Sequence, residues 1–312
     1  MSQNISRSSI IADALSDNWV DKYAPESLKP YFKLARLDRP AGLWLLLLPC
    51  WLGQLLSELE AGHYFPDLYF MFLFAVGAFV MRGAGCTWND IIDRDYDGRV
   101  ARTALRPIPS GQVSVKEAFL FAVSLSLIGF LTIIQFNIFT VFLGISSLGL
   151  VAAYPFAKRY TYWPQLLLGL TFKWGVLVGW AAVQGELSFA PIVLYVGCVF
   201  WTIGYDTIYA HQDRDDDAML GLKSTAIRFG DNTPRWLLFF YFSALFFWCI
   251  AAAVAGAGVF TMLGLSAIMI HFTWQIVTLD ITDGAKCLFR FKSNNSVGLI
   301  FLIGILFDIL LR

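Results

Sequence analysis

Charged residues are scarce in this chain, and neither sign of charge predominates. Asp, Glu, Lys and Arg make up 15% of its 312 residues, against about 25% in ordinary soluble domains. Basic and acidic residues number 23 each, so the net charge does not indicate a nucleic acid as a partner. Hydrophobic residues reach 57%. That share is too high for a water-soluble globule and indicates a protein that works in a lipid bilayer.

Cysteine pairs with the spacing of metal ligands are also absent. The five cysteines stand apart along the chain without a CxxC pair, which argues against a zinc or redox centre. Most of them fall inside or beside apolar runs, so we interpret them as small apolar side chains that fill helix contacts.

Residues 1–30 contain no apolar stretch of signal-peptide length, and they carry Asp13, Asp17, Asp21 and Glu26. This pattern is typical of neither a secretory signal nor an Arg-rich, acid-poor transit peptide. We therefore expect an integral protein of a bacterial cell inner membrane, with a processed organellar form as the alternative.

Nine apolar runs are long enough to cross a bilayer, which takes about 20 helical residues. They lie near residues 40–58, 68–87, 117–134, 138–154, 165–183, 189–209, 235–256, 257–279 and 297–311. The boundary around Gly256 and Gly258 is the least clear, so eight spans are an open alternative. The predicted fold class is all-α: a multi-span membrane helical bundle, with a cytoplasmic segment at residues 1–35 and a single transmembrane domain at residues 36–312.

The basic residues between these runs lie on one side of the membrane. With nine spans, alternate connections face opposite sides, and every connection on the second side lacks Lys and Arg. By the positive-inside rule, the basic connections and the N-terminus are cytoplasmic. The basic residues of these connections are Arg94, Arg99, Arg102, Arg106, Lys116, Lys158, Arg159, Arg214, Lys223, Arg228, Arg235, Lys286, Arg290 and Lys292.

Two clusters of acidic residues follow the second and sixth apolar runs, at the cytoplasmic side. At 100° per residue, each cluster places three side chains on one stripe of a helix. The two stripes are Asn89, Asp93 and Asp97, and Asp206, Asp213 and Asp217. Clustered carboxylates beside an apolar span repel one another unless cations lie between them, and their hard oxygen ligands suit Mg²⁺. The two segments therefore predict a magnesium site.

Arginines and lysines flank the aspartates on the same side of the membrane. They are Arg102, Arg106, Lys158, Arg159 and Lys223. Such side chains bind the non-bridging oxygens of a diphosphate. Because metal and bases together stabilise negative charge on a leaving diphosphate, this combination favours cleavage of the C–O bond of an allylic diphosphate.

These motifs closely resemble the UbiA family of intramembrane aromatic prenyltransferases. The family's NDxxDxxxD pattern is matched at residues 89–97, and its RTxxRPxxSG pattern at residues 102–111. Its second acidic pattern, YDTxYAxxDxxDD followed by GxKST, is matched at residues 205–225. The stretches at residues 36–51 and 154–165 resemble the branch that prenylates 4-hydroxybenzoate in ubiquinone biosynthesis.

The resemblance implies a nine-helix fold around a central cavity open to lipid, with Mg²⁺ held by both acidic motifs. On the matching positions, it implies that the metal and diphosphate ligands are Asp93, Asp97, Asp213 and Asp217. It also implies support from Asn89 and Asp90, and a substrate-site arginine at Arg159. The implied reaction transfers a polyprenyl group from polyprenyl diphosphate to the ring carbon ortho to the hydroxyl of 4-hydroxybenzoate.

Two roles in this reaction stay open at the level of sequence. The carboxylate of the aromatic acid needs a basic partner, for which Arg36 and Arg159 are both candidates. The proton that leaves the ring has three candidate acceptors: Asp206, Asp90 and the released diphosphate. The alternative for Asp206 is a structural pair with Arg82.

Aromatic side chains complete the expected site, and one lysine nearby departs from the family's pattern. An allylic cation needs dry, π-rich surroundings, so aromatic residues beside the acidic motifs, Tyr209 among them, are expected near the substrate. Lys173 departs from the small or neutral polar residue expected in its stretch LGLTFKWG. Its ammonium is expected to extend to the membrane surface or to pair with an acidic motif, and contact with the substrate carboxylate is the alternative.

Other functions compete with this interpretation. Within the same family, the acceptor could be dihydroxynaphthoate, homogentisate, haem or glycerol phosphate. A carboxylate-based secondary transporter is the alternative from a different class. A transporter should hold its acids near helix centres, whereas here they lie at helix ends beside Arg and Lys. The prenyltransferase is therefore the favoured function.

Overall fold

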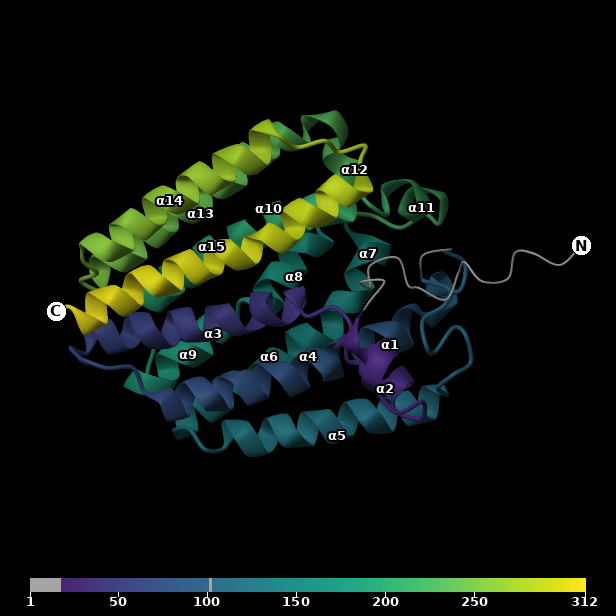
Figure 1. Cartoon of the computed structure of the whole chain (residues 1–312), viewed down its shortest axis with the longest axis horizontal. Helices are drawn as coiled ribbons and strands as arrows, with labels where there is room; N and C mark the ends of the chain where they lie inside the picture. Colours follow the sequence, from purple (N-terminus) through teal and green to yellow (C-terminus); the bar gives the residue numbers. More distant parts are fainter. Residues whose placement is uncertain (1–17, 101–102) are drawn as a thin grey trace, which may run out of the picture. The chain divides into compact units, whose positions relative to one another are not determined.

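The computed structural model describes residues 18–100 and 103–312, and all regular secondary structure in these ranges is helical (Figure 1). The helices are α1 Trp19–Tyr23, α2 Lys29–Leu34, α3 Ala41–Glu60, α4 Leu68–Asp97, α5 Val115–Ile133, α6 Ile138–Ala153, η1 Tyr154–Phe156, α7 Ala157–Tyr160, α8 Pro164–Phe172, α9 Gly175–Gln184, α10 Phe189–Ala210, α11 Arg214–Met219, α12 Thr225–Phe229, η2 Gly230–Asn232, α13 Thr233–Val254, α14 Val259–Val277 and α15 Gly284–Leu310. The predicted all-α class is confirmed.

Nine helical segments in the described ranges are long and apolar enough to span a membrane. Three of them combine consecutive helices: Ile138–Tyr160 joins α6 to α7, Pro164–Gln184 joins α8 to α9, and Thr225–Val254 joins α12 to α13. The predicted number of spans is therefore confirmed.

The seventh and eighth spans are divided where the sequence was least clear. Gly256 takes the left-handed conformation (φ 73°), which a residue with a side chain rarely adopts. Asp308 of α15 then accepts hydrogen bonds from the backbone N–H groups of Gly258, Phe260 and Thr261, at 2.9 to 3.1 Å. A carboxylate on these otherwise unpaired N–H groups stabilises the start of α14 as a separate helix.

The ninth span begins earlier than its hydropathy predicted. Helix α15 starts at Gly284, with Asp283 capping the N–H of Lys286 at 3.0 Å. The expected loop containing Lys286, Arg290 and Lys292 is therefore wrong, because these residues are helical. Arg290 is buried and donates to the Thr278 carbonyl, so its charged group is satisfied inside the protein.

The chain forms two compact units. The first contains the described residues of Met1–Leu43 and Val76–Thr132, and the second contains Trp44–Ala75 and Ile133–Arg312. The first acidic motif belongs to the first unit, and the second motif to the second. The division into a segment 1–35 and a single domain 36–312 stays a prediction.

The first unit packs the later part of α4 on α5, with α2 beside them. Leu34, Ile91, Ile108, Val113 and Ala118 form its buried apolar cluster. Ile108 and Val113 come from the loop between α4 and α5. Burying these two side chains ties the loop, and the basic residue Arg106 within it, to the end of α4.

The second unit is organised around α10, which packs against α8, α9, α13 and α15. Figure 1 shows α14 and the yellow α15 running side by side, and they are in extensive contact. Trp180, Trp201, Trp248 and Phe301 are large, fully buried side chains of this core. Most residues of α10 are buried. This packing fixes the position of Asp206 near the end of the helix.

Candidate active site

The first acidic motif lies on the last turns of α4. The helix continues to Asp97, so the predicted stripe of Asn89, Asp93 and Asp97 is confirmed as three positions one turn apart. Asn89 donates its side-chain amide to Asp93 Oδ2 at 3.3 Å. This bond orients the Asp93 carboxylate, and the roles of Asn89 and Asp93 toward metal and diphosphate stay predictions.

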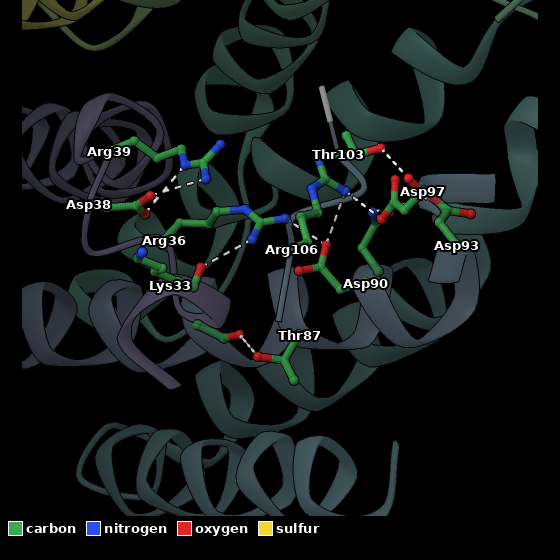
Figure 2. A network of polar contacts seen from close by, with 12 residues as sticks. Lys33, Arg36, Asp38, Arg39, Thr87, Asp90, Asp93, Asp97, Thr103 and Arg106 are labelled. Atoms are coloured by element: carbon green, nitrogen blue, oxygen red, sulfur yellow. Dashed lines mark hydrogen bonds and ion pairs between the residues drawn. The ribbon is translucent and has the colours of Figure 1, made fainter. Parts of the chain in front are cut away.

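Two arginines and two aspartates form an alternating series of ion pairs in the first unit (Figure 2). Arg36 Nη2 lies 2.5 Å from Asp90 Oδ1, and Arg106 Nη1 lies 3.2 Å from the same oxygen. Arg106 Nη1 also lies 2.6 Å from Asp97 Oδ2. Asp90 is wholly buried and the other three are nearly so. Because each charge has an opposite neighbour, the set tolerates burial that an isolated ion would not.

The backbone at Arg36, the first residue of this series of ion pairs, is strained. Arg36 is the one non-glycine residue of the described chain with a positive φ, 59°, a conformation that costs about 1–3 kcal/mol. Its Nη1 donates to the Lys33 carbonyl at 3.1 Å. Burial alone would lower the pKa of Arg36, but the Asp90 carboxylate raises it above the ordinary value. The guanidinium is therefore charged and already bound to protein atoms, which makes Arg36 a weaker candidate for the substrate carboxylate than the sequence suggested.

Thr103 stabilises the same series of ion pairs, and the sequence patterns above assign it no role. Its hydroxyl donates to the backbone carbonyl of Asp97 at 2.8 Å (Figure 2). This bond joins the loop to the last residue of α4, so that Arg106 meets Asp97. The RTxxRP pattern contains Thr103, and this was the signal that could have identified it. Arg102 lies outside the described residues.

The second acidic motif is broken, contrary to prediction. Helix α10 ends at Ala210, and Asp213 precedes the separate short helix α11. Asp206, Asp213 and Asp217 therefore do not share a stripe of one continuous helix. The physical reason is the helix dipole: carboxylates are unfavourable at the C-terminal end of α10 and favourable in the first turn of α11.

The loops that carry the basic residues of the second unit are joined. Lys223 donates its backbone N–H to the Lys158 carbonyl at 2.9 Å and its ammonium to the Tyr160 carbonyl at 3.2 Å. Arg159 lies on α7, with its guanidinium 5.3 Å from the ring of Phe156. The structure thus joins the segment of Lys158 and Arg159 to the loop of Lys223, which the sequence placed on two separate connections.

Asp206 and Tyr209 lie near the end of α10. The charged residues Lys158, Asp213 and Lys173 of the second unit lie within electrostatic range of Asp206. The ring of Tyr209 lies 4.6 Å from that of Phe291 on α15. In the first unit, the Arg82 guanidinium packs against Gly42, and a pair between Arg82 and Asp206 stays a prediction.

Lys173 does not reach the membrane surface. Its side chain is fully buried between α8 and α9, and its ammonium donates to the Leu45 carbonyl at 2.8 Å. The expectation that it extends to the surface is therefore wrong.

The donor set suits Mg²⁺, although within residues 18–100 and 103–312 no three His, Cys, Asp or Glu side chains form a ready-made metal cluster. All the candidate ligands are carboxylates, and Asp97 and Asp217 are largely buried. Mg²⁺ commonly binds through one or two carboxylates, water and substrate phosphates rather than in a cage made only of protein. Asp93 and Asp97 could hold it in the first unit, and Asp213 and Asp217 in the second.

Two curated relatives cover nearly the whole chain. The mitochondrial 4-hydroxybenzoate polyprenyltransferase of Aedes aegypti is 46% identical over 97% of this chain and 70% of its own length. The enzyme of the same name from Homo sapiens is 46% identical over 90% of this chain and 76% of its own length. The expectation of a bacterial inner membrane is contradicted by these relatives, which are mitochondrial enzymes of eukaryotes. What stands is an integral membrane protein.

Solved structures share the same fold. A UbiA homologue from Aeropyrum pernix K1 superposes with a TM-score of 0.73 and is 26% identical, covering 86% of this chain and 98% of its own. A UbiA homologue from Archaeoglobus fulgidus, bound to GPP and Mg²⁺, has a TM-score of 0.62 and 17% identity, covering 91% of this chain and 100% of its own. The sequence pattern of the UbiA prenyltransferase family matches residues 46–296. The chain belongs to the UbiA prenyltransferase family.

Proposed function

We propose that this chain transfers a polyprenyl group from polyprenyl diphosphate to 4-hydroxybenzoate, at the ring carbon ortho to the hydroxyl, as a step of ubiquinone biosynthesis. The observation that carries the proposal is the 46% identity, over nearly the whole chain, with two enzymes named for this reaction. The acidic motifs and the bases around them supply the groups that the reaction needs.

Asp93, Asp97, Asp213 and Asp217 are the proposed ligands of Mg²⁺, and Asn89 and Asp90 support them. When bound, the metal neutralises charge on the diphosphate and so favours its departure. The Archaeoglobus fulgidus homologue, which is bound to GPP and Mg²⁺, supports this choice of ion.

The chain's basic residues hold the diphosphate in the proposed reaction. Arg106 already bonds to Asp97, so a guanidinium lies directly beside a proposed metal ligand and can donate further to a phosphate oxygen. Lys158 and Lys223 lie on joined loops of the second unit, and Arg102 is the remaining candidate. These cations stabilise negative charge as the C–O bond of the allylic diphosphate breaks.

The acceptor then forms the new bond. The ring carbon ortho to the phenol attacks C1 of the prenyl group, a C–C bond forms, and a proton leaves the same ring carbon. Arg159 is the proposed partner of the carboxylate, as the resemblance to the family implies, and Arg36, which bonds to Asp90 and the Lys33 carbonyl, is the second candidate. The proton leaves to Asp206, to Asp90 or to the released diphosphate, and both arginine contacts of Asp90 fall on its Oδ1.

A transfer assay tests this function. The purified protein is given 4-hydroxybenzoate, a polyprenyl diphosphate and Mg²⁺, and the product is identified by mass spectrometry and NMR. We expect a carbon-alkylated product substituted ortho to the hydroxyl, loss of the rate in excess chelator, and its recovery when Mg²⁺ is restored. Absence of this product, or an unchanged rate in chelator, would contradict the reaction or the metal respectively.

A further inference from the structure

Lys173 is a buried cation that the proposed reaction does not use. It lies at the interruption between α8 and α9, inside the span Pro164–Gln184, and its side chain is fully buried. A charge at such a position is unfavourable unless specific groups compensate for it, and charged residues inside membrane spans are commonly functional. The groups around its ammonium indicate what it does.

The first of these groups is a carbonyl that a proline leaves unpaired. In a regular helix, the Leu45 carbonyl would accept the backbone N–H of residue 49, but residue 49 is Pro49, inside α3, and proline has no N–H. Lys173 Nζ donates to that carbonyl at 2.8 Å. The lysine therefore supplies the hydrogen bond that α3 lacks.

The second group is a pair of aromatic rings on α10. Lys173 Nζ lies 4.4 Å from the ring centre of Trp201 and 5.3 Å from that of Tyr205. The two rings meet edge to face, 5.4 Å apart. Both distances from the ammonium are within the range of a cation–π interaction, which strengthens away from water. From the other side, Trp201 Nε1 donates to Asn294 at 2.8 Å.

The Trp201 and Tyr205 rings are connected to the proposed site through Phe291. Tyr205 contacts Phe291 at 5.7 Å between ring centres, and Phe291 contacts Tyr209 at 4.6 Å. Tyr205 also directly precedes Asp206 in the chain. A change in the Trp201 and Tyr205 rings is therefore passed on through Phe291 to Tyr209, near the end of α10.

We propose that Lys173 is a positioning residue for prenyl transfer: its charge holds the Trp201 and Tyr205 rings so that α10 presents Asp206 and Tyr209 to the substrates. Its hydrogen bond to Leu45 serves the fold alone. The expected effect on kcat rests on the proposed function. The expected effect on the orientation of the two rings does not. A neutral side chain at position 173 loses the charge, and a backbone N–H at position 49 can replace the hydrogen bond.

The test separates these two roles with the variants Lys173→Met, Pro49→Ala and the double variant. In Pro49→Ala the new N–H pairs with the Leu45 carbonyl, so the double variant keeps α3 bonded but lacks the cation. Lys116→Gln, which changes an exposed lysine, is the matched control. Each protein is examined for thermal unfolding in detergent, for near-ultraviolet circular dichroism of its aromatic rings, and for kcat and KM with both substrates.

We expect Lys173→Met to lower kcat about 10-fold with KM changed less than about 2-fold, since misorientation affects the chemical step more than binding. Its unfolding temperature should fall by about 3 °C. The double variant should regain the unfolding temperature while kcat and the aromatic dichroism stay as in Lys173→Met. Wild-type kcat and dichroism in the double variant would overturn the proposal, as would wild-type kcat in Lys173→Met. If the wild-type protein did not prenylate 4-hydroxybenzoate, the proposed function would fail, and the dichroism would still decide whether Lys173 orders the rings.

Discussion

Arg36 and Asp90, 54 residues apart in the chain, form a buried ion pair of 2.5 Å at the first acidic motif. The pair joins the segment before α3 to the last turns of α4. Because Asp90 also contacts Arg106, which in turn contacts Asp97, Arg36 acts on the proposed metal ligand through two intermediates. The strained backbone of Arg36 (φ 59°) is then the local cost of placing this guanidinium.

Replacing Arg36 by glutamine should therefore damage both fold and activity. Loss of one partner leaves a buried carboxylate with less compensation, which costs about 3 kcal/mol. We expect a lower unfolding temperature in detergent and a transfer rate reduced by at least about 10-fold. Arg94→Gln is the control, because its pair with Asp95 is exposed and contributes about 0–1 kcal/mol. Equal stability of the two variants would show that the buried pair has no special role.

Asp93 and Asp95 are two carboxylates of one motif that should differ in function. Asp95 has 72% of its side chain exposed and pairs with Arg94, whereas Asp93 accepts the Asn89 amide on the stripe with Asp97. We expect Asp93→Asn to lower kcat at least about 100-fold, since a metal ligand contributes several kcal/mol to the transition state. Asp95→Asn should retain the wild-type rate. The reverse order of rates would exclude the assignment of Asp93.

Asp213 and Asp215 offer the same comparison in the second unit. Asp215 is 91% exposed beside Arg214, and Asp213 precedes α11. Transfer by Asp213→Asn should fall at least about 100-fold for the same reason as in the first motif, and Asp215→Asn should be unaffected. Raising the Mg²⁺ concentration should partly restore Asp213→Asn. Full activity of that variant at low Mg²⁺ would remove Asp213 from the proposed ligands.

A close contact between α3 and α9 should make Gly179 intolerant of any side chain. A Cβ atom placed there would lie 2.1 Å from the Cys50 carbonyl oxygen, and a backbone atom cannot move aside as a side chain can. We expect Gly179→Ala to lower the stability by about 1–3 kcal/mol, measured by thermal unfolding. Gly149→Ala is the control, because open space surrounds that position, and a similar loss in both would argue against the contact.

The sequence predicts the fold and the first motif well for physical reasons. Hydropathy identifies spans because lipid demands long apolar helices, and a spacing of four residues on α4 suffices to align Asn89, Asp93 and Asp97. Sequence patterns fail where contacts between distant segments decide the local structure. The polar start of α15 is helical because its buried groups find partners, such as Asn294 with Trp201, and hydropathy does not register such partners.

Three features of the site were beyond the reach of sequence reasoning. The end of α10 at Ala210 depends on the balance between helix continuation and the dipole that favours a new helix. The pairing of Arg36 with Asp90 joins distant segments, so local spacing cannot reveal it. The place of Lys173 depends on Pro49, 124 positions earlier in the sequence, whose effect on the Leu45 carbonyl is visible only when α3 and α8 are seen together.

The most direct measurement of the central claim is a competition assay with purified protein in lipid. Equal amounts of 4-hydroxybenzoate, dihydroxynaphthoate and homogentisate are offered with polyprenyl diphosphates of several lengths and Mg²⁺, and every product is quantified by mass. We expect 4-hydroxybenzoate to be consumed in large excess over the other two acceptors, giving the ring-alkylated acid. Preferential prenylation of dihydroxynaphthoate or homogentisate, or no transfer to 4-hydroxybenzoate, would contradict it.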